Sequence, residues 1–340
     1  LIIGTYGNGI SVLDGREKQF TNFSHDPDNL SSLSSNIVWS FFKDSRGRLW
    51  VGTNNGLNLL NDDQHSFQNH RQNTLQPHWF GNNPITAIAE DNDNQLWLGT
   101  ERNGLFVLNL NNQKIEHYLT SSDKRSSLPH NSIAALHRDR AGNMWVGTFN
   151  GLCLFNSSTK TFTNFHHGLG EAIQVNSIYE NDEGQLWLAT SKGGSLFDPV
   201  SKIFKNYSHI PGDTTTLSSN FVMSVIEDQK KGVWFATDHG LNFLNTQTQK
   251  INTLHYGGLD YPGDYFYSIV EDTKGRLWSG MNKGLLVLSP DSNFAPDQQR
   301  WGDLKNYTQA DGIQHNEFNI GAYFKDKNGW LYMGGINGFS

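Results

Sequence analysis

Short runs of apolar and alternating residues follow one another along almost the whole chain. Residues 37–42 form an apolar run and residues 56–60 an alternating one, with polar turns rich in Asp, Asn and Gly between such runs. A period of two, with many aromatic and β-branched residues, is typical of β-strands. No stretch of twelve or more residues places apolar side chains at helical spacing. The pattern therefore predicts an all-β protein.

One hairpin phrase recurs along the chain. It reads LWVGTNNGLN at 49–58, MWVGTFNGLC at 144–153 and VWFATDHGLN at 233–242. The Gly or Ala before its turn stands at positions 4, 52, 99, 147, 189, 236, 280 and 334, so successive copies are 42 to 54 residues apart. This spacing is the length of one four-stranded propeller blade.

Each repeat divides into four strands, which we name a to d. Strand a is apolar, as at 37–42, and a turn with Asp and Gly follows it at 43–47. Strand b carries the Trp, strand c follows the Gly-containing turn, and strand d has alternating aromatic residues, as at 162–165. Asp and Gly are the residues that tight hairpin turns favour.

Strand a begins near residues 37, 84, 132, 174, 221, 265 and 319. These copies predict a seven-bladed β-propeller of four-stranded antiparallel blades, with eight blades as the alternative because one copy of strand b is surplus. We expect residues 1–340 to form a single propeller domain, cut from a longer protein. The chain begins with strands b to d and ends with strands a, b and part of c, so its termini are expected to share the closing blade and remove exposed sheet edges.

Two neighbouring positions of strand a behave differently along the repeats. One position is always small: Ser40, Ala87, Ala135, Ser177, Ser224, Ser268 and Ala322. A small residue beside a large Trp is what face-to-face packing of blades requires. The position before it follows no rule: Trp39, Thr86, Ala134, Asn176, Met223, Tyr267 and Gly321. Such freedom suits a ligand surface, and equally a solvent-facing position without a role.

The whole phrase SSNIVWSFFKDSRGRLWVGTNNGLNLLN at 34–61 resembles the two-component regulator propeller repeat. That repeat builds the extracytoplasmic sensor region of hybrid two-component systems and of related histidine kinases and diguanylate cyclases. The resemblance covers practically the whole chain, and the tail at 311–340 is similar to the closing segment of a membrane-proximal propeller. Ala189, Ala236 and Ser279 depart from the repeat pattern.

The resemblance implies that this chain is the periplasmic, ligand-sensing part of a membrane-bound receptor. In such proteins an immunoglobulin-like domain, a transmembrane helix and a signalling output usually follow the propeller. The expected partners are a neighbouring propeller, the immunoglobulin-like domain of the same chain, and a second copy in a homodimer. The expected ligand is an oligosaccharide or another small soluble nutrient.

Composition narrows the classes of partner. Charged residues make up 17% of the chain, and the formal net charge is −7. No basic stripe is present to displace counterions from phosphates, so nucleic acid is excluded as a partner. No run of 18 or more apolar residues is present to span a membrane. The single cysteine, Cys153, permits no internal disulfide and has the surroundings of a buried apolar residue.

A propeller carries its function in the loops of one face, and the d–a loops and b–c turns emerge together. The candidate ligand-binding residues on this face are Trp39, His78, Trp79, Phe80, Arg102, Phe149, His239, Tyr261, Asp264, Tyr265 and Tyr267. Aromatic faces stack on sugar rings, and nearby carboxylates and amides bond to hydroxyls. The alternative is that the rings fill gaps between blades and that the turn residues are only solvated.

Catalytic and metal-binding patterns are not found. The 13 His residues fall into no HxxxH or HExxH arrangement, and no GxSxG or P-loop sequence occurs. We therefore assign no catalytic residue, cofactor or metal, and expect this part of the chain not to be an enzyme. Two readings compete with sensing: an interaction scaffold without a small-molecule ligand, and a polysaccharide hydrolase or lyase using carboxylates such as Glu171, Asp260 and Asp264.

Overall fold

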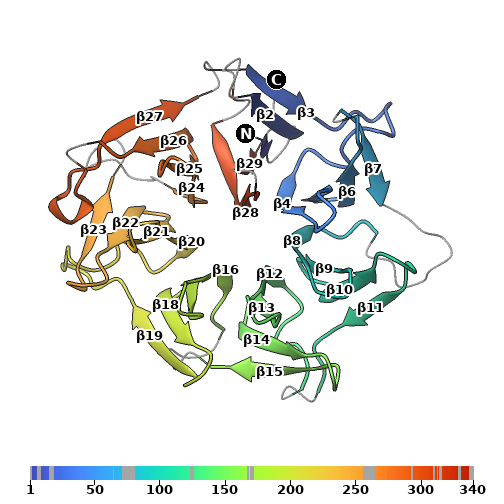
Figure 1. Ribbon diagram of the computed structural model, residues 1–340, viewed down its shortest axis with the longest axis horizontal. Helices are drawn as coiled ribbons and strands as arrows, with labels where there is room; N and C mark the ends of the chain where they lie inside the picture. The colour runs from blue at the N-terminus through green and yellow to red at the C-terminus, as the bar shows by residue number, and fades with distance from the viewer. Residues whose placement is uncertain are drawn as a thin grey trace.

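The computed structural model describes residues 2–5, 9–14, 19–63, 65–70, 81–122, 126–166, 168, 172–255, 265–291, 294–308, 311, 313, 316–327 and 331–336. Over these residues the chain is all-β, as the hydrophobic pattern predicts. Its sheets stand in a ring around a central channel, with strand a of each repeat innermost and strand d outermost (Figure 1). The single helical segment described is the short 3₁₀ turn Pro296–Gln298.

Six sheets have four antiparallel strands each, and we number them blades 1 to 6. Blade 1 is β4 (Val38–Lys43), β5 (Leu49–Thr53), β6 (Gly56–Leu60) and β7 (Phe67–His70); blade 2 is β8 (Ile85–Glu90), β9 (Gln95–Thr100), β10 (Leu105–Asn109) and β11 (Ile115–Tyr118). Blade 3 is β12 (Ile133–Arg138), β13 (Met144–Thr148), β14 (Gly151–Asn156) and β15 (Thr161–Phe165); blade 4 is β16 (Val175–Glu180), β17 (Leu186–Thr190), β18 (Gly193–Asp198) and β19 (Ile203–Tyr207). Blade 5 is β20 (Val222–Glu227), β21 (Val233–Thr237), β22 (Gly240–Leu244) and β23 (Ile251–Leu254); blade 6 is β24 (Val270–Glu271), β25 (Leu277–Met281), β26 (Gly284–Ser289) and β27 (Asp303–Tyr307).

The remaining strands form a five-stranded closing sheet from both ends of the chain. Its order is β28 (Glu317–Lys325), β29 (Leu331–Ile336), β1 (Ile2–Thr5), β2 (Gly9–Asp14) and β3 (Gln19–Phe23). In Figure 1 the dark blue start and the red end of the chain meet there. β1 and β29 run parallel, with Gly4 opposite Gly334.

The predictions of seven or eight four-stranded antiparallel blades are wrong, because only six sheets of the described residues have that form. The error has a physical source in the surplus copy of strand b. Residues 2–5 and 331–336 are both strand-b phrases, and both enter the closing sheet side by side instead of one of them starting a further blade. The alternation of apolar and polar residues within each strand does not reveal that two copies of strand b pair in parallel.

The innermost strands contain a bulge at the position that follows no rule. In β4, Val38 pairs with Thr53 and Ser40 with Gly52, so Trp39 has no paired residue. The same shift leaves out Thr86, Ala134, Asn176 and Met223 in blades 2 to 5. A bulged residue stands outside the ladder and its side chain is redirected. Pairing therefore does not select the identity of this residue.

Several of these redirected side chains connect neighbouring blades. The Thr86 hydroxyl donates to the Ile133 carbonyl at 2.6 Å, and the Asn176 amide nitrogen donates to the Val222 carbonyl at 2.7 Å. Asn319 of the closing sheet donates to the carbonyl of Val38 in blade 1 at 3.0 Å. Each bond satisfies the first carbonyl of the next inner strand.

The turn between strands a and b is fixed by a carboxylate that accepts from the buried Trp. Asp oxygens lie 2.8 to 3.0 Å from the indole nitrogens in five blades: Asp44–Trp50, Asp91–Trp97, Asp139–Trp145, Asp228–Trp234 and Asp272–Trp278. The other oxygen of the same carboxylate accepts backbone N–H groups of the turn, as from Gln95 to Asp91 at 3.0 Å. Blade 4 has Asn181 at this position, and Trp187 donates to Glu227 of blade 5 at 3.3 Å.

The hydrophobic core lies between neighbouring blades. One cluster joins Trp50 and Leu57 of blade 1 to Ile88 and Phe106 of blade 2. Close approach of the sheets demands a small residue at the end of strand b: a Cβ on Gly52 would collide with the Ser40 side chain and the Ile85 carbonyl. The Trp, the small residue of strand a and the Gly therefore form one packing unit.

Blade 2 allows this turn to be tested with a matched pair of aspartates. Asp91→Ala is expected to lower the free energy of unfolding by about 2–3 kcal/mol, because the buried Trp97 indole and the Gln95 N–H lose their acceptor. Asp93→Ala changes an exposed residue of the same turn, and its effect should stay within about 0.5 kcal/mol. Urea denaturation gives both values, and equal values would contradict the assigned role of Asp91.

Candidate functional site

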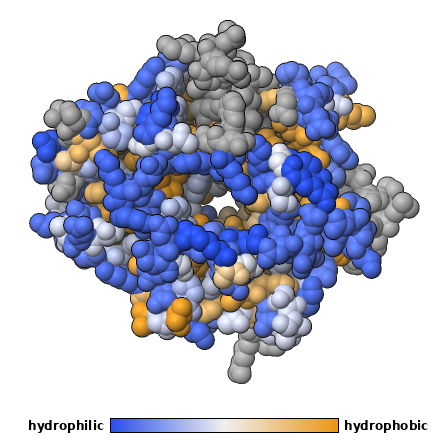
Figure 2. All heavy atoms as spheres, in the orientation of Figure 1, coloured by the Kyte–Doolittle hydropathy of each residue, from blue (hydrophilic) through white to orange (hydrophobic). Residues whose placement is uncertain are grey.

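The central channel contains a cavity of about 720 Å³. It is lined by the inner strands β4, β8, β12, β16 and β28 and reaches the turns between strands a and b. Figure 2 shows a face of the molecule hollowed at its centre, with hydrophilic residues around the opening. We name the two ends of the channel after their turns: strand a begins at the b–c end and finishes at the a–b end.

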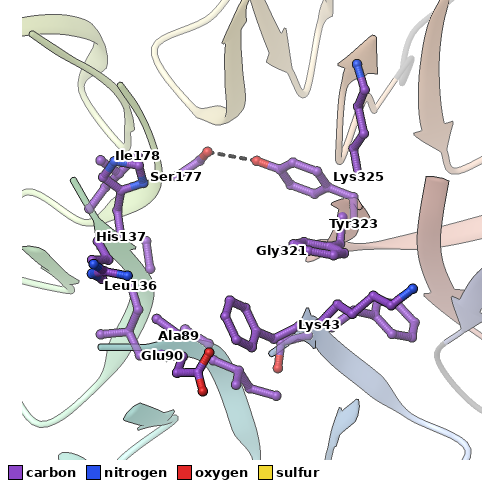
Figure 3. Close-up of a pocket in the computed structure, with 18 of the residues that line it drawn as sticks. Lys43, Ala89, Glu90, Leu136, His137, Ser177, Ile178, Gly321, Tyr323 and Lys325 are labelled. Atoms are coloured by element: carbon purple, nitrogen blue, oxygen red, sulfur yellow. Dashed lines mark hydrogen bonds between the residues drawn. The ribbon is translucent and has the colours of Figure 1, made fainter. Parts of the chain in front are cut away.

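The interior of the cavity is partly apolar and partly polar. Leu136 and Ile178 contribute aliphatic wall. From β28, the Tyr323 side chain reaches across to β16, and its hydroxyl lies 2.8 Å from the Ser177 hydroxyl (Figure 3). Burial raises the pKa of Tyr323, so this hydroxyl stays protonated and available as a donor.

Asn176 is the one amide side chain of the lining, and 2% of its surface is exposed. Its nitrogen donates to Val222, but its Oδ1 atom has no hydrogen-bond partner among the described residues. A buried acceptor without a partner is uncommon in folded proteins.

The last residue of strand a is charged in every repeat. These seven rim residues are Lys43, Glu90, Arg138, Glu180, Glu227, Glu271 and Lys325. Glu90 accepts from the backbone N–H and the hydroxyl of Ser45 at 2.6 and 3.0 Å, so blade 2 holds the a–b turn of blade 1. Lys43 in turn forms an ion pair with Asp326 of the closing sheet at 2.8 Å.

The same contact with the preceding blade recurs around the rim. Glu180 accepts from the Arg140 N–H at 3.0 Å, and Glu271 accepts from the Gln229 N–H at 3.0 Å. Arg138 donates to the Asn92 side chain. The pKa of Glu271 is raised, chiefly by burial. The rim thus ties the a–b turns of blades 1, 2, 3 and 5 to the next blade, with cations and anions mixed around the opening.

His137 lies beside this rim with its Nε2 atom 3.5 Å from Glu180. Burial lowers the pKa of His137, although the Glu180 carboxylate opposes that shift. The imidazole is therefore neutral at pH 7, so it does not add a positive charge to the cavity.

Of the sequence-predicted ligand residues, Tyr265 and Tyr267 are brought together. Their rings stack with centroids 6.1 Å apart, and the Tyr267 hydroxyl lies 3.5 Å from a carboxylate oxygen of Glu317. Burial, followed by the Glu317 charge, raises the pKa of Tyr267. Tyr265 is 37% exposed. This tyrosine pair belongs to the b–c end of the channel, because Tyr265 and Tyr267 precede β24.

Other candidates stand separately around the same face. Arg102 contacts Glu101 at 3.4 Å in blade 2, Phe149 stacks on His130 with centroids 5.9 Å apart in blade 3, and His239 lies 3.2 Å from Asp238 in blade 5. Trp39 is the bulged residue of β4. Each therefore has neighbours of its own, and these contacts assemble no common site.

Five further candidates fall outside the residues that the structure describes. They are His78, Trp79, Phe80, Tyr261 and Asp264.

Sequence reasoning missed the cavity at the a–b end. A signal was present, because each turn that begins with Asp or Asn is preceded by Lys, Glu or Arg, as in KDSRG at 43–47 and EDTKG at 271–275. A charged residue of either sign at the last position of strand a in every repeat indicates that these positions share a polar environment. The direction of those side chains was not readable from spacing alone.

The cavity offers hydrogen bonding in a partly enclosed space. Within the described ranges, no three His, Cys, Asp or Glu side chains gather as a metal site. Over the same part of the chain, no helix has the length and apolar character needed to cross a bilayer. The arrangement suits reversible binding of a polar molecule.

The buried His137 predicts a pH dependence of stability. Below about pH 6.5 the unfolded chain takes up a proton on this side chain that the native state resists, so stability falls from pH 7 to pH 5. His137→Gln removes that part of the fall and should give a flatter curve of denaturation midpoint against pH. His239→Gln, an exposed change, is the control, and parallel curves for His137→Gln and the unsubstituted protein would contradict the expectation.

Comparison with known proteins connects this geometry to a family. Four segments match the model described as "Two component regulator propeller", at residues 32–55, 80–102, 127–150 and 260–283. In blades 1 to 3 each segment covers strand a, the turn with Asp, and strand b. The matched segments therefore contain the Asp–Trp bond that fixes the hairpin.

Histidine kinase P4 of Formosa agariphila is 28% identical over 338 residues, covering 83% of this chain and 24% of that protein. This chain thus spans about a quarter of the length of that relative. A solved extracellular domain of a putative hybrid two-component system from B. thetaiotaomicron superposes with a TM-score of 0.69, at 24% identity, covering 90% of this chain and 40% of that one. PorZ of Porphyromonas gingivalis, an essential surface component of the type-IX secretion system, gives a TM-score of 0.66 at 17% identity over 97% of this chain and 49% of its own. At these identities the solved structures show a shared propeller fold.

Proposed function

We propose that this chain, four segments of which match the two-component regulator propeller model, is the ligand-sensing propeller of a membrane-bound bacterial receptor. Propellers of this family are sensor domains and not catalysts. A relative named as a histidine kinase and a fold shared with the extracellular domain of a hybrid two-component system support an extracytoplasmic, periplasmic location.

The ligand of this sensor is an oligosaccharide that binds at the tyrosine pair. The observation that carries the proposal is the stacked, partly exposed Tyr265–Tyr267 pair beside the Glu317 carboxylate. Aromatic faces bury the apolar side of a sugar ring, and a carboxylate accepts from its hydroxyls. The described part of this site provides both groups at the b–c end of the channel.

Sensing requires the ligand to bind one receptor state more tightly than another. A ligand with equal affinity for both states would shift no equilibrium. The tyrosine pair and Glu317 lie on blade 6 and the closing sheet, respectively. An oligosaccharide held between them would favour one relative position of these two sheets. That change in relative position would be transmitted to the neighbouring propeller, the immunoglobulin-like domain and a homodimer partner.

A second candidate function is an interaction scaffold. Val200 and Ile203, in and beside the outermost strand of blade 4, are 91% and 65% exposed. Large apolar side chains that stand in water at a sheet edge favour contact with another protein. This observation supports docking at the outer edge of a blade, away from the channel.

Binding of oligosaccharides tests the proposal directly. Titration calorimetry with a panel of neutral and acidic oligosaccharides should find a saturable ligand, and Tyr265→Ala should weaken it by about tenfold, because the exposed stacking ring is lost. The melting temperature should change by less than about 4 °C, since Tyr265 contributes little buried surface. Leu304→Ala, a change of similar exposure on the outer strand of blade 6, is the control.

Two outcomes would overturn oligosaccharide sensing at this pair. One is the absence of saturable binding across the panel. The other is equal loss of affinity in Tyr265→Ala and Leu304→Ala. A concentration-dependent dimer that Ile203→Ser abolishes, together with no oligosaccharide binding, would favour the scaffold.

A further inference from the structure

The cavity at the a–b end is separate from the tyrosine pair. Its lining comes from β4, β8, β12, β16 and β28, and it includes neither Tyr265 nor Tyr267. A volume of about 720 Å³ lies within the range of small-molecule sites in proteins. The charges of the lining decide what kind of molecule such a site would hold.

The carboxylates of the lining are buried and already bonded. Asp44, Glu90 and Asp326 are 5%, 8% and 4% exposed. Each of them accepts from a side chain of the protein, in the pairs Asp44–Arg48, Glu90–Ser45 and Asp326–Lys43. Little of their surface is therefore offered to a molecule in the cavity.

Three cations of the lining are in the opposite situation. Arg138, Lys325 and Lys327 are exposed, and none of them forms an ion pair with a carboxylate among the described residues. Arg138 donates to the neutral side chain of Asn92. The charge of Lys325 partly opposes the rise in the pKa of Glu271, a rim residue outside the lining. The accessible charge of the cavity is therefore positive.

The neighbouring carboxylates of the rim do not cancel this charge. Glu180 and Glu227 do not line the cavity, and their side chains are 8% and 9% exposed. Glu227 also forms an ion pair with Lys231 at 3.1 Å. The chain as a whole has a formal net charge of −7. Accessible cations at this opening are therefore a local property that the overall composition does not predict.

The cations stand on two walls of the channel. Arg138 ends β12 and Lys325 ends β28, and these strands face each other across the channel (Figure 1). Figure 3 shows Lys325 on one side of the cavity and Leu136, also of β12, on the other. A guanidinium binds a carboxylate through two parallel hydrogen bonds, and an ammonium binds it as a point charge. Two such walls suit a molecule with an anionic group at each end.

We propose that the central cavity binds an organic dianion, namely a dicarboxylate. One carboxylate contacts Arg138 and the other contacts Lys325 and Lys327, while the carbon chain lies against Leu136 and Ile178. A molecule with one carboxylate would satisfy only one wall. The propeller would then carry two separate sites, one for an oligosaccharide at the tyrosine pair and one for an organic acid in the channel.

The experiment is titration calorimetry of the whole chain with succinate, glutarate, adipate and suberate. Hexanoate, hexanediol and inorganic phosphate are the comparison molecules. One dicarboxylate should bind with one site per chain, at least about tenfold tighter than hexanoate. The affinity should pass through a maximum as the chain lengthens, because both carboxylates must reach their walls. It should fall when NaCl is raised from about 0.05 M to about 0.5 M, because salt screens exposed charges.

Substitutions locate the site. Arg138→Gln should weaken binding by about tenfold, and Arg138→Lys, which keeps the charge, should weaken it less. Lys325→Gln combined with Lys327→Gln should reduce the affinity to that of hexanoate. The control is Lys114→Gln combined with Lys250→Gln, an equal loss of charge in exposed c–d turns at the a–b end, outside the lining. It should leave the affinity within about twofold. All these side chains are exposed, so melting temperatures should stay within about 3 °C.

The proposal is wrong if no dicarboxylate binds, or if hexanoate or hexanediol binds as tightly as the best dicarboxylate. It is also wrong if the control double variant loses as much affinity as the double variant at the cavity. Inorganic phosphate binding more tightly than every dicarboxylate would indicate a site for a single anionic group and would overturn it too. The absence of oligosaccharide binding at Tyr265 would leave these titrations unaffected, so the two proposals fail separately.

Discussion

The bond between a turn carboxylate and a buried tryptophan is the interaction on which the architecture depends. The indole is large enough to fill the space between two blades, but its N–H group must find a partner there. In five of the six blades an Asp six residues earlier provides that partner and at the same time accepts the turn N–H groups, as Asp91 does for Trp97 and Gln95. One carboxylate therefore sets the shape of the hairpin and the position of the core side chain, which is why these residues recur together.

The structure of the repeated unit could largely be predicted from the sequence, whereas the number of blades and the function of the propeller could not. Strand type, the turn with Asp and the small residue of strand a all follow from local patterns, and the structure contains them. The blade count failed because two copies of strand b join one sheet through a parallel pairing, as at Gly4 and Gly334. Alternation within a strand carries no information about which strand lies beside it.

The candidate site was partly readable for a related reason. Tyr265 and Tyr267 are close in sequence, so their stacking follows from local geometry. The cavity joins Asn176 and Ser177 of blade 4 to Tyr323 of the closing sheet, and such a meeting depends on closure of the ring. The position of Asn176 had no rule in the repeats, and the bulge explains why: a residue outside the ladder is selected by what it faces and not by its pairing.

The closing sheet is the place where the two ends of the chain pair and complete the ring. Six blades are each made from consecutive residues, so each is complete once its own segment of chain exists. The seventh sheet joins residues 2–5 to residues 331–336, the longest separation between paired strands in the described chain. Such a contact carries the largest entropy of loop closure and forms late in folding. During synthesis the blades would therefore accumulate as an open arc with unpaired edges, and the circle would be completed only after the last strand has been made.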